Sequence, residues 1–383
     1  RKAFKLPFIE EKTNLEIETT SNLKLSLYNS ITEIDKDTWN ALFNNKGNFD
    51  WEALLTMEKA YAGNQLEEEN WTFHYLVIED IATKKVVLAT HFTASIFKDD
   101  LLTPAEVSKN IEVKRKDDKY YLCSKTLSMG SLLTEGQHLH IDRSYHQWSE
   151  AVILMVNEAF KIQENEKANS LILRDFNSDD IEIASILNNQ GFFRMDMPNS
   201  NVIHFKEDQN CSNDYIEELT SRSRRGIRYD VLKHSKHFKS EVSNTVSNSD
   251  LKTIYELYEQ TAQNNYGINI FKYPFSLFQE ILKNDNWEFF MLRTTDNQIV
   301  ATLCCYKGSS VYSPVLMGVD YLTQQDSSVY KQIMYRVVVS ARSRGFKSIL
   351  FGYSADIEKR KLGAEQIAKT AYINVLDQYN LEL

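Results

Sequence analysis

The stretch SILFGYSADIEKRKLGAEQIAK, from Ser348 to Lys369, is the most informative part of the chain. It opens as a short apolar strand, reaches Tyr353 where the strand pattern ends, and continues into a densely charged segment. An earlier stretch, LILRDFNSDDIE at 171–182, has the same order with one residue inserted: apolar strand, aromatic residue, small polar residues, then Asp-Ile-Glu. Since a hairpin–strand–helix–strand order also occurs in both halves, this repeat indicates a duplicated α/β unit.

The predicted elements fall into two similar halves. We expect a polar lead-in or linker at 1–22, a first lobe at 23–206 and a second lobe at 207–383. Strands are predicted at 23–31, 71–80, 84–97, 119–133, 169–176, 200–205, 287–294, 299–308, 310–320 and 346–353. Helices are predicted at 35–43, 50–63, 148–162, 214–233, 250–264, 274–283 and 327–345. Because residue 1 is Arg and not Met, we expect a fragment, a processed product or one domain of something longer.

Composition is that of an ordinary globular protein. A hydrophobic content of 42% over 383 residues is enough for sizeable cores. The net charge of −9 gives no general attraction to DNA or to an anionic membrane, and the longest apolar run is too short to span a bilayer. Four cysteines without CxxC spacing favour a reducing compartment, so we expect a cytoplasmic protein with no integral membrane segment.

Several motifs resemble a known superfamily. The duplicated unit and the ending GYSADIEKRKLGA look like the GNAT superfamily, and more narrowly like its tandem, FemAB-like branch of acyl and aminoacyl transferases. The basic stretch SRSRRGIRYDVLKHSKHFK resembles the helix that opens the second half of such proteins, and YELYEQTAQNNYG and PFSLFQEIL resemble the next helix pair. The resemblance covers Leu23 to Leu383 and implies an α/β fold of two tandem GNAT-like lobes, each a mixed, mostly antiparallel sheet flanked by helices.

The first half also looks like a narrower group. KDDLLTPAEVSKN, LSMGSLLTEGQHLHIDR and LILRDFNSDD resemble the GNAT-type portion of bacterial fusions with a pyridoxal-phosphate (PLP)-dependent, aminotransferase-fold enzyme of the α-oxoamine synthase-like kind. The resemblance implies a fused or associated PLP enzyme as partner. It also implies that the acceptor is a small-molecule amine, such as an α-oxoamine or amino acid made by that partner.

The helix predicted at 327–345 is the candidate seat for a donor cofactor. Its N-terminus would present free N–H groups and a positive dipole end to a phosphate, so cofactor binding is assigned to Ser327, Ser328, Tyr330 and Lys331. An ordinary capped core helix is the competing interpretation. Neither half has the Arg/Gln-x-x-Gly-x-Gly/Ala loop of GNAT proteins, which leaves acyl-CoA open as the donor.

The charged segment after Tyr353 is the candidate catalytic site. Amide formation needs a base to deprotonate the amine and an acid for the leaving group. Tyr353 is the candidate acid, Asp356 a base or a holder of the acceptor ammonium, and Lys359 falls at the Lys of the family's Lys-x-x-(Leu)-Gly-Ala pattern and is assigned to substrate contact. A solvated helix with pairs such as Asp356–Arg360 is the alternative. We expect Tyr353 and Lys359 to line a crevice shared by the two lobes.

Two further groups of charged residues are candidates for substrate binding. Arg174 and Asp175 are adjacent near a strand end, where neighbours point to opposite faces, so at most one should face a pocket unless the strand has ended. Arg225 and Arg228 belong to the most basic stretch, which would suit CoA phosphates, an acidic acceptor, a tRNA end or a lipid head group, or would simply be a solvated helix. No metal site is predicted, because no Cys or carboxylate completes a ligand set with the histidines.

The leading functional hypothesis is an N-acyltransferase that moves an acyl group from acyl-CoA to an amine by direct attack. The alternatives are an aminoacyl-tRNA-dependent, FemAB-like transferase and a catalytically degenerate module that only binds a ligand or a fused PLP enzyme. Overall acidity weighs against tRNA, whereas the basic stretch 222–239 weighs for it.

Overall fold

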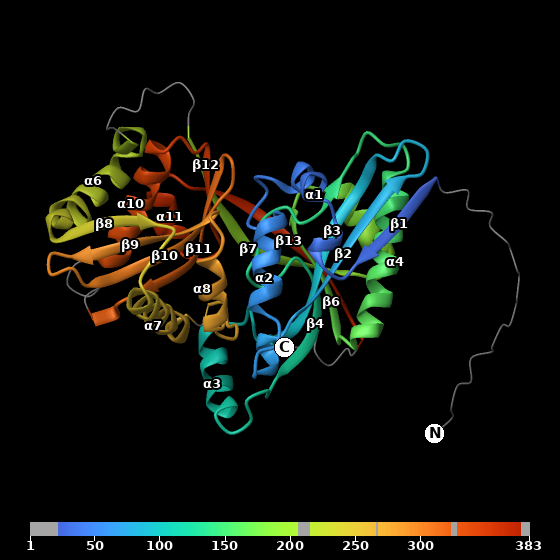
Figure 1. Cartoon of the computed structure of the whole chain (residues 1–383), viewed down its shortest axis with the longest axis horizontal. Coiled ribbons are helices and arrows are strands. Elements are labelled where there is room, and N and C mark those ends of the chain that lie inside the picture. The colour runs from blue at the N-terminus through green and yellow to red at the C-terminus, as the bar shows by residue number, and fades with distance from the viewer. Residues whose placement is uncertain (1–21, 206–214, 266, 323–327, 377–383) are drawn as a thin grey trace, which may run out of the picture.

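The computed structural model describes residues 22–205, 215–265, 267–322 and 328–376. The predicted lead-in and the predicted boundary between residues 206 and 207 fall outside these residues, apart from residue 22. Most strands join one continuous mixed sheet in the order β1-β2-β3-β4-β6-β13-β7-β12-β11-β10-β9-β8, and β5 pairs with β3 (Figure 1). The sheet is mostly antiparallel, and helices flank it in both halves, as the fold prediction requires.

The strands of the first half precede residue 205 and those of the second half follow residue 237. They are β1 (Leu23–Tyr28), β2 (Thr72–Asp80), β3 (Val86–Lys98), β4 (Cys123–Met129), β5 (His140–Ile141), β6 (Ser170–Asn177), β7 (Phe193–His204), β8 (Phe238–Ser243), β9 (Trp287–Thr294), β10 (Ile299–Lys307), β11 (Val311–Val319), β12 (Ser348–Gly352) and β13 (Glu365–Val375). The helices are α1 (Lys36–Phe43), α2 (Trp51–Ala60), α3 (Ala105–Arg115), α4 (Trp148–Glu166), α5 (Ile181–Asn189), α6 (Ser221–Asp230), α7 (Asn248–Asn264), α8 (Phe275–Ile281), α10 (Val329–Ser343) and α11 (Asp356–Lys361).

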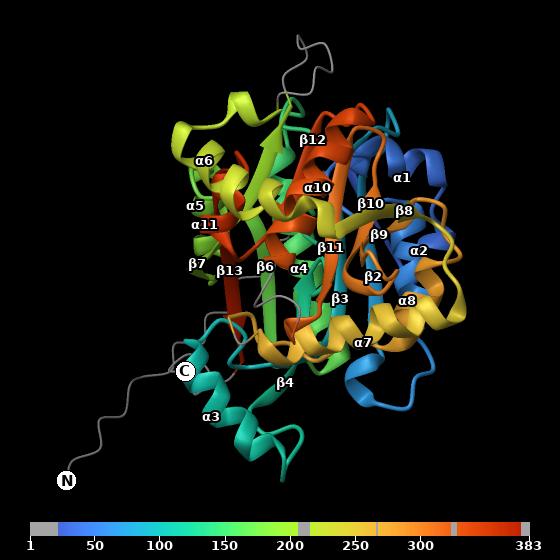
Figure 2. The same cartoon turned by 90° about the vertical axis from the view of Figure 1, so that its left-hand side faces the viewer.

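The last strand of each half is exchanged into the other half. β13 lies between β6 and β7 and is antiparallel to both, while β7 lies between β13 and β12 (Figures 1 and 2). Each half therefore contributes one strand to the middle of the other half's sheet. The β6–α5 and β12–α11 units, which carry the repeated sequence motif, occupy equivalent places on either side of this exchange.

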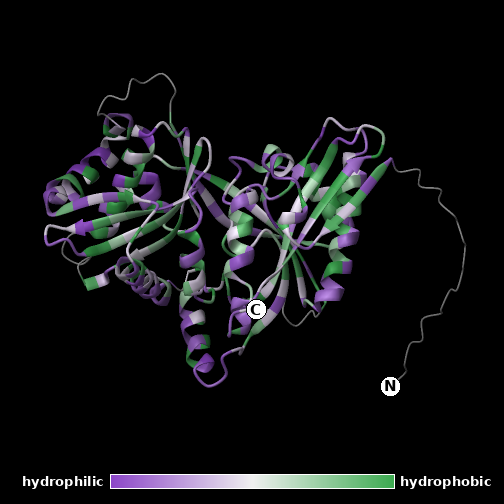
Figure 3. Cartoon of the chain, viewed as in Figure 1, coloured by the Kyte–Doolittle hydropathy of each residue, from purple (hydrophilic) through white to green (hydrophobic). Residues whose placement is uncertain are grey.

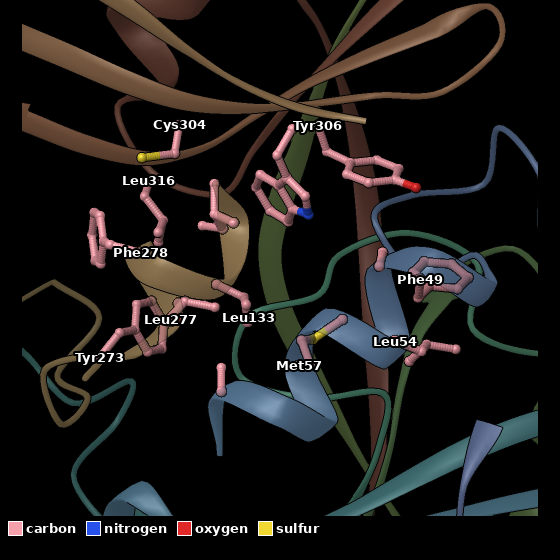
Figure 4. Packing of buried hydrophobic residues seen from close by; sticks show 14 of the residues in the cluster. Phe49, Leu54, Met57, Leu133, Tyr273, Leu277, Phe278, Cys304, Tyr306 and Leu316 are labelled. Atoms are coloured by element: carbon pink, nitrogen blue, oxygen red, sulfur yellow. The ribbon is translucent and has the colours of Figure 1, made fainter. Parts of the chain in front are cut away.

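Among the described residues, two hydrophobic clusters lie mainly within one half each, and a third, the common core, spans both halves. It joins side chains of α1 and α2 with side chains of α7, α8, β9 and β10. Figure 4 shows Met57 and Leu133 of the first half beside Leu277 and Phe278 of the second. Tyr273 crosses the same junction, because its hydroxyl donates to the carbonyl of Leu132 over 2.8 Å. The two lobes are thus held by shared packing as well as by shared strands.

Local sequence signals explain many element boundaries. The Asp35 carboxylate caps α1 and the Asp50 carboxylate caps α2, each accepting from a backbone N–H three residues on. In contrast, the helix predicted at 214–233 is broken in its described part into a 3₁₀ turn at Tyr215–Glu218, α6, and a second 3₁₀ segment at Leu232–His237. Helices α3 and α5 and strands β5, β8 and β13 were not predicted.

Hydropathy follows this architecture. In Figure 3 the hydrophobic colour concentrates along the strands of both lobes, and hydrophilic residues dominate outer helices such as α7. Across the part of the chain that the structure describes, no helix has the length and apolarity needed to cross a bilayer.

Shared packing predicts cooperative unfolding. Phe278 is fully buried in the common core, so Phe278→Ala should lower the free energy of unfolding by about 3–5 kcal/mol. Both halves should lose protection at the same urea concentration, as followed by hydrogen exchange with mass spectrometry. Phe193→Ala, at a side chain that is 59% exposed, is the control and should have little effect. Separate transitions for the two halves would contradict the shared core.

Candidate active site

The parallel strands of each half diverge where the two lobes meet. β4 and β6 pair in parallel from Thr126 to Ser128, and β11 and β12 pair in parallel only at Val311 and Tyr312. In the first half, a loop at 130–139 enters this divergence. The Arg174 guanidinium of β6 holds the loop by donating to the carbonyls of Ser131, over 2.8 Å, and Thr134, over 2.7 Å.

Arg174 and Asp175 act together, contrary to the expectation for neighbours on a regular strand. The register of β6 against β13 shifts at these two residues, and Asp175 has a left-handed backbone conformation with φ of 69°. This bulge turns both side chains toward each other, with Arg174 Nε 3.0 Å from Asp175 Oδ2. His138 Nδ1 lies 2.9 Å from the same oxygen. Asp175 and His138 are buried, Arg174 is largely buried, and the cluster rests against the loop.

Burial and charge act in opposite directions in this cluster. Burial favours the protonated form of Asp175, but Arg174 and His138 outweigh it, and the pKa of Asp175 is lowered. Burial also lowers the pKa of His138, although Asp175 opposes the shift. A buried carboxylate next to a guanidinium and a neutral imidazole is a stable arrangement that fixes the loop at 130–139.

Glu135, in this loop, is the residue that sequence reasoning missed. Its carboxylate accepts a 2.6 Å hydrogen bond from the hydroxyl of Ser200 on β7 and lies over Gly352 at the end of β12. A side chain at Gly352 would collide with it, because a Cβ there would lie 2.6 Å from Glu135 Oε2. Burial raises the pKa of Glu135 to about 7, and the Ser200 hydrogen bond only partly offsets this. A partly exposed carboxyl group that changes protonation near neutral pH can act as a base.

The end of β12 carries the predicted catalytic residues. Lys359, only 5% exposed, donates to the carbonyls of Phe351 (2.9 Å), Gly352 (3.1 Å) and Tyr353 (2.6 Å). An ammonium group has three N–H donors, so these carbonyls use all of them. Burial lowers the pKa of Lys359 to about 8, while the nearby Glu135 opposes the shift. In this conformation Lys359 holds the strand end and does not line an open crevice.

Tyr353 and Asp356 lie next to this lysine. The hydroxyl of Tyr353 is buried without a hydrogen-bond partner among the described residues, which leaves it available to a ligand. Asp356 Oδ1 accepts a 2.9 Å hydrogen bond from the side-chain amide of Asn201 on β7, and the same amide nitrogen lies 2.9 Å from the carbonyl oxygen of Gly352. The structure therefore brings Glu135, Tyr353, Asp356 and Lys359 to one junction between the lobes.

The remaining predicted residues lie elsewhere in the second half. Ser328 precedes α10 in a left-handed conformation with no side-chain cap, Tyr330 is partly buried on its first turn, and Ser327 lies outside the described residues. Lys331 donates to Asp230 of α6 over 2.6 Å. Arg225 and Arg228 are both exposed, and Arg228 pairs with Glu217 over 2.6 Å.

Two surface hollows lie between the lobes on the side of α1 and α2. The larger, of about 490 Å³, is lined by residues that include Lys36, Asn44, Lys307 and Arg344. The other, of about 290 Å³, lies between α2 and the end of α8. Of the predicted site residues that the structure describes, none lines either hollow. The charged groups of the larger one are already neutralised in part, as Arg344 binds Glu288 at 2.5 and 2.9 Å.

The fold is similar to that of proteins built from tandem GNAT-like lobes. FemX has a solved structure that matches with a TM-score of 0.60 at 13% identity, covering 91% of this chain and 98% of that chain. A tandem GNAT protein from the clavulanic acid biosynthesis pathway matches with a TM-score of 0.51 at 9% identity, covering 92% of this chain and 98% of that chain. These similarities confirm the predicted fold.

The sequence identifies the family more narrowly. The FemAB-like family, described as peptidoglycan biosynthesis/recognition, matches residues 30–314, and the chain belongs to this family. The predicted FemAB-like resemblance is thereby confirmed. The comparison with curated proteins found no match. Association with a PLP enzyme stays a prediction.

The role of Arg174 can be tested through stability. Arg174→Ala would leave the buried Asp175 carboxylate without its guanidinium, so we expect a loss of about 3–5 kcal/mol in the free energy of unfolding, measured with urea. Arg143→Ala is a matched control, because Arg143 pairs with two carboxylates but is 38% exposed, and should cost at most about 1 kcal/mol. Equal losses in the two variants would contradict the buried role of Arg174.

The raised pKa of Glu135 predicts a pH-dependent stability. Its ordinary pKa is 4.5, so between this value and about 7 the folded state keeps a proton that the unfolded state has lost. Stability should therefore fall as pH rises through that window. Glu135→Gln should remove this slope and make the protein more stable than the original by about 1–3 kcal/mol near pH 8, in urea titrations at several pH values. Glu106→Gln, an exposed control, should keep the original pH dependence.

Proposed function

We propose that this protein transfers an aminoacyl group from an aminoacyl-tRNA ester to a primary amine of a peptidoglycan precursor, forming an amide. Membership of a family described by peptidoglycan biosynthesis/recognition supports the acceptor class. The FemAB-like assignment favours aminoacyl-tRNA over acyl-CoA, which the sequence alone had placed first. Neither half has the glycine-containing loop typical of GNAT acyl-CoA sites, and this also weighs against acyl-CoA.

The observation that carries the chemistry is Glu135 over the end of β12. A primary amine has an ordinary pKa near 8–10 and must lose a proton before or during attack. A carboxyl group with a pKa of about 7 is half ionised near neutral pH and can accept that proton. Arg174, Asp175 and His138 are positioning residues in this proposal, because they hold the loop that carries Glu135.

The proposed step is a direct displacement. The acceptor amine first loses one proton to solvent, and the neutral nitrogen then attacks the ester carbonyl carbon; the new C–N bond forms, and the C–O bond to the ribose oxygen of the tRNA breaks. Glu135 takes one proton from the amine, and Tyr353 gives a proton to the leaving ribose oxygen, which departs as a hydroxyl. Proton exchange with solvent then restores both groups. The products are an amide and deacylated tRNA, with no covalent enzyme intermediate.

The donor is assigned to the second half because the connection between strand and helix is shorter there than in the first half. The connection from β4 to α4 spans residues 130–147, and the loop that fills the divergence of β4 and β6 belongs to it. The corresponding connection from β11 to α10 spans only residues 320–328. This shorter connection supports the second divergence, beside Tyr353, as the place for the ester end of the donor.

Transfer assays with the Glu135 variant test this proposal. The assay follows a labelled amino acid from aminoacyl-tRNA to a soluble peptidoglycan precursor peptide with a free amine. Glu135→Gln should lower kcat/KM by about 10²–10⁴-fold and remove the rise of activity toward about pH 7. The exposed control Glu106→Gln should keep the original kcat/KM and the original pH dependence of activity. Acetyl-CoA in place of aminoacyl-tRNA is the parallel arm. Transfer from acetyl-CoA alone would overturn the donor assignment, and full activity of Glu135→Gln would overturn the base.

A further inference from the structure

One face of α6 carries a stripe of cations that the candidate site does not use. Arg222 and Gly226 are four residues apart, as are Arg225 and Tyr229, so these two pairs lie side by side on one face of α6, and Lys233 of the following 3₁₀ segment lies over the Tyr229 ring. We call these five residues the α6 stripe. Arg222, Arg225, Tyr229 and Lys233 are exposed, whereas the opposite face buries Ile227.

The acids around α6 are bound to other cations. Glu217 accepts from Arg224, over 3.2 Å, and from Arg228, over 2.6 Å. Asp230 accepts from Lys331 of α10. Within the described residues, neither Arg222 nor Arg225 has a carboxylate partner. Their charges are therefore available to a ligand.

The stripe does not serve the stability of its own helix. Cations near a helix N-terminus are unfavourable, because the helix dipole is positive there, and the first turn of α6 has no acid. Gly226 lies in the helix interior, yet no neighbouring atom lies within 4 Å of where its Cβ would be, so packing does not require a glycine. Tyr229 is 67% exposed, and the Lys233 ammonium lies 4.9 Å from its ring centre.

We propose that the α6 stripe binds the RNA body of the donor. This inference rests on the proposed function. The two guanidinium groups match phosphate oxygens, the absent side chain at Gly226 lets a nucleic-acid backbone approach the helix, and the Tyr229 ring offers a surface on which an unpaired base can stack. The sequence had assigned substrate binding to Arg225 and Arg228. The structure favours Arg225 for the RNA contact, since Arg228 is paired with Glu217.

The position of α6 suits a donor whose ester end enters the second half. Asp230 ties α6 to the first turn of α10. Tyr215, in the turn before α6, hydrogen-bonds through its hydroxyl to the carbonyl of Leu362, directly after α11. Figures 1 and 2 show α6, α10 and α11 on the same side of the second lobe. RNA bound along the stripe would therefore lie next to the elements that carry Tyr353.

The composition of the stripe favours RNA over an anionic lipid surface. A peripheral membrane helix needs a broad apolar face to insert beside its cations. The α6 stripe offers one aromatic ring, and the net charge of −9 repels an extended anionic surface. A few cations beside one aromatic ring suit a folded RNA that contacts the protein only at this patch.

Binding of deacylated tRNA to the full chain tests the inference directly. Arg222→Glu/Arg225→Glu should weaken binding at least about tenfold and reduce the slope of log K against log salt by about 1.5–2, since two phosphate contacts are lost. Lys84→Glu/Lys116→Glu, an equal change of charge at exposed lysines of the first half, should change neither the affinity nor the salt dependence.

The stacking role of Tyr229 has its own test. Tyr229→Ala should weaken binding about 5–100-fold while Tyr229→Phe retains it, because a phenyl ring also stacks. Thermal melting checks that the Arg222→Glu/Arg225→Glu variant is folded. The two introduced glutamates should stabilise α6, because negative charge is favourable near a helix N-terminus.

A second measurement separates this inference from the proposed function. Transfer is compared between full aminoacyl-tRNA and a short ester of the same amino acid on adenosine. The Arg222→Glu/Arg225→Glu variant should lower transfer from tRNA relative to the short ester at least about tenfold. Stripe-dependent tRNA binding without transfer from either donor would overturn the proposed function alone. Transfer that is indifferent to the stripe, or stripe-dependent binding to anionic phospholipid vesicles but not to tRNA, would overturn the inference alone.

Discussion

The exchange of β7 and β13 is the constraint on which the site depends. Each strand fills the middle of a sheet whose other strands come from the opposite half, so neither half has a complete sheet by itself. The exchange places the ends of β6 and β12 on either side of one junction. Ser200 and Asn201, both on β7, then reach Glu135 of the first half and Asp356 of the second. A site built from both halves follows from the strand order.

The junction concentrates features that cost free energy. Asp175, Ser354 and Ala355 have left-handed backbones without being glycine, the Lys359 ammonium is buried, and the partly buried Glu135 carboxyl has a raised pKa. The common core and the long β7–β13 pairing are strong enough to hold these residues in place. Left-handed backbones therefore lie at equivalent strand ends in both halves, next to the residues that the proposed function uses.

Local patterns in the sequence were sufficient for some parts of the structure and not for others. The repeated Asp-Ile-Glu motif located the two equivalent strand ends, and apolar alternation located β2, β3, β9 and β10. The exchange of β13 was not predictable, because pairing between distant strands leaves no period in either strand. Glu135 lies in a loop and meets Ser200 only through the fold, so no spacing signals it. The contact of Arg174 with Asp175 depends on a β-bulge, and the sequence of the strand does not predict where that bulge occurs.

The two halves, although built alike, have diverged in what they can do. In the first half the loop at 130–139 fills the divergence of β4 and β6, and Arg174 holds it there by bonds to its backbone. That half therefore supplies a rigid support for one carboxyl group. The second half has the shorter connection and the exposed cations of α6, together with the Tyr353 hydroxyl, for which the described residues supply no hydrogen-bond partner. Under the proposed function the two halves are asymmetric: the first half positions a base, and the second half carries the exposed cations on which a large anionic donor would lie.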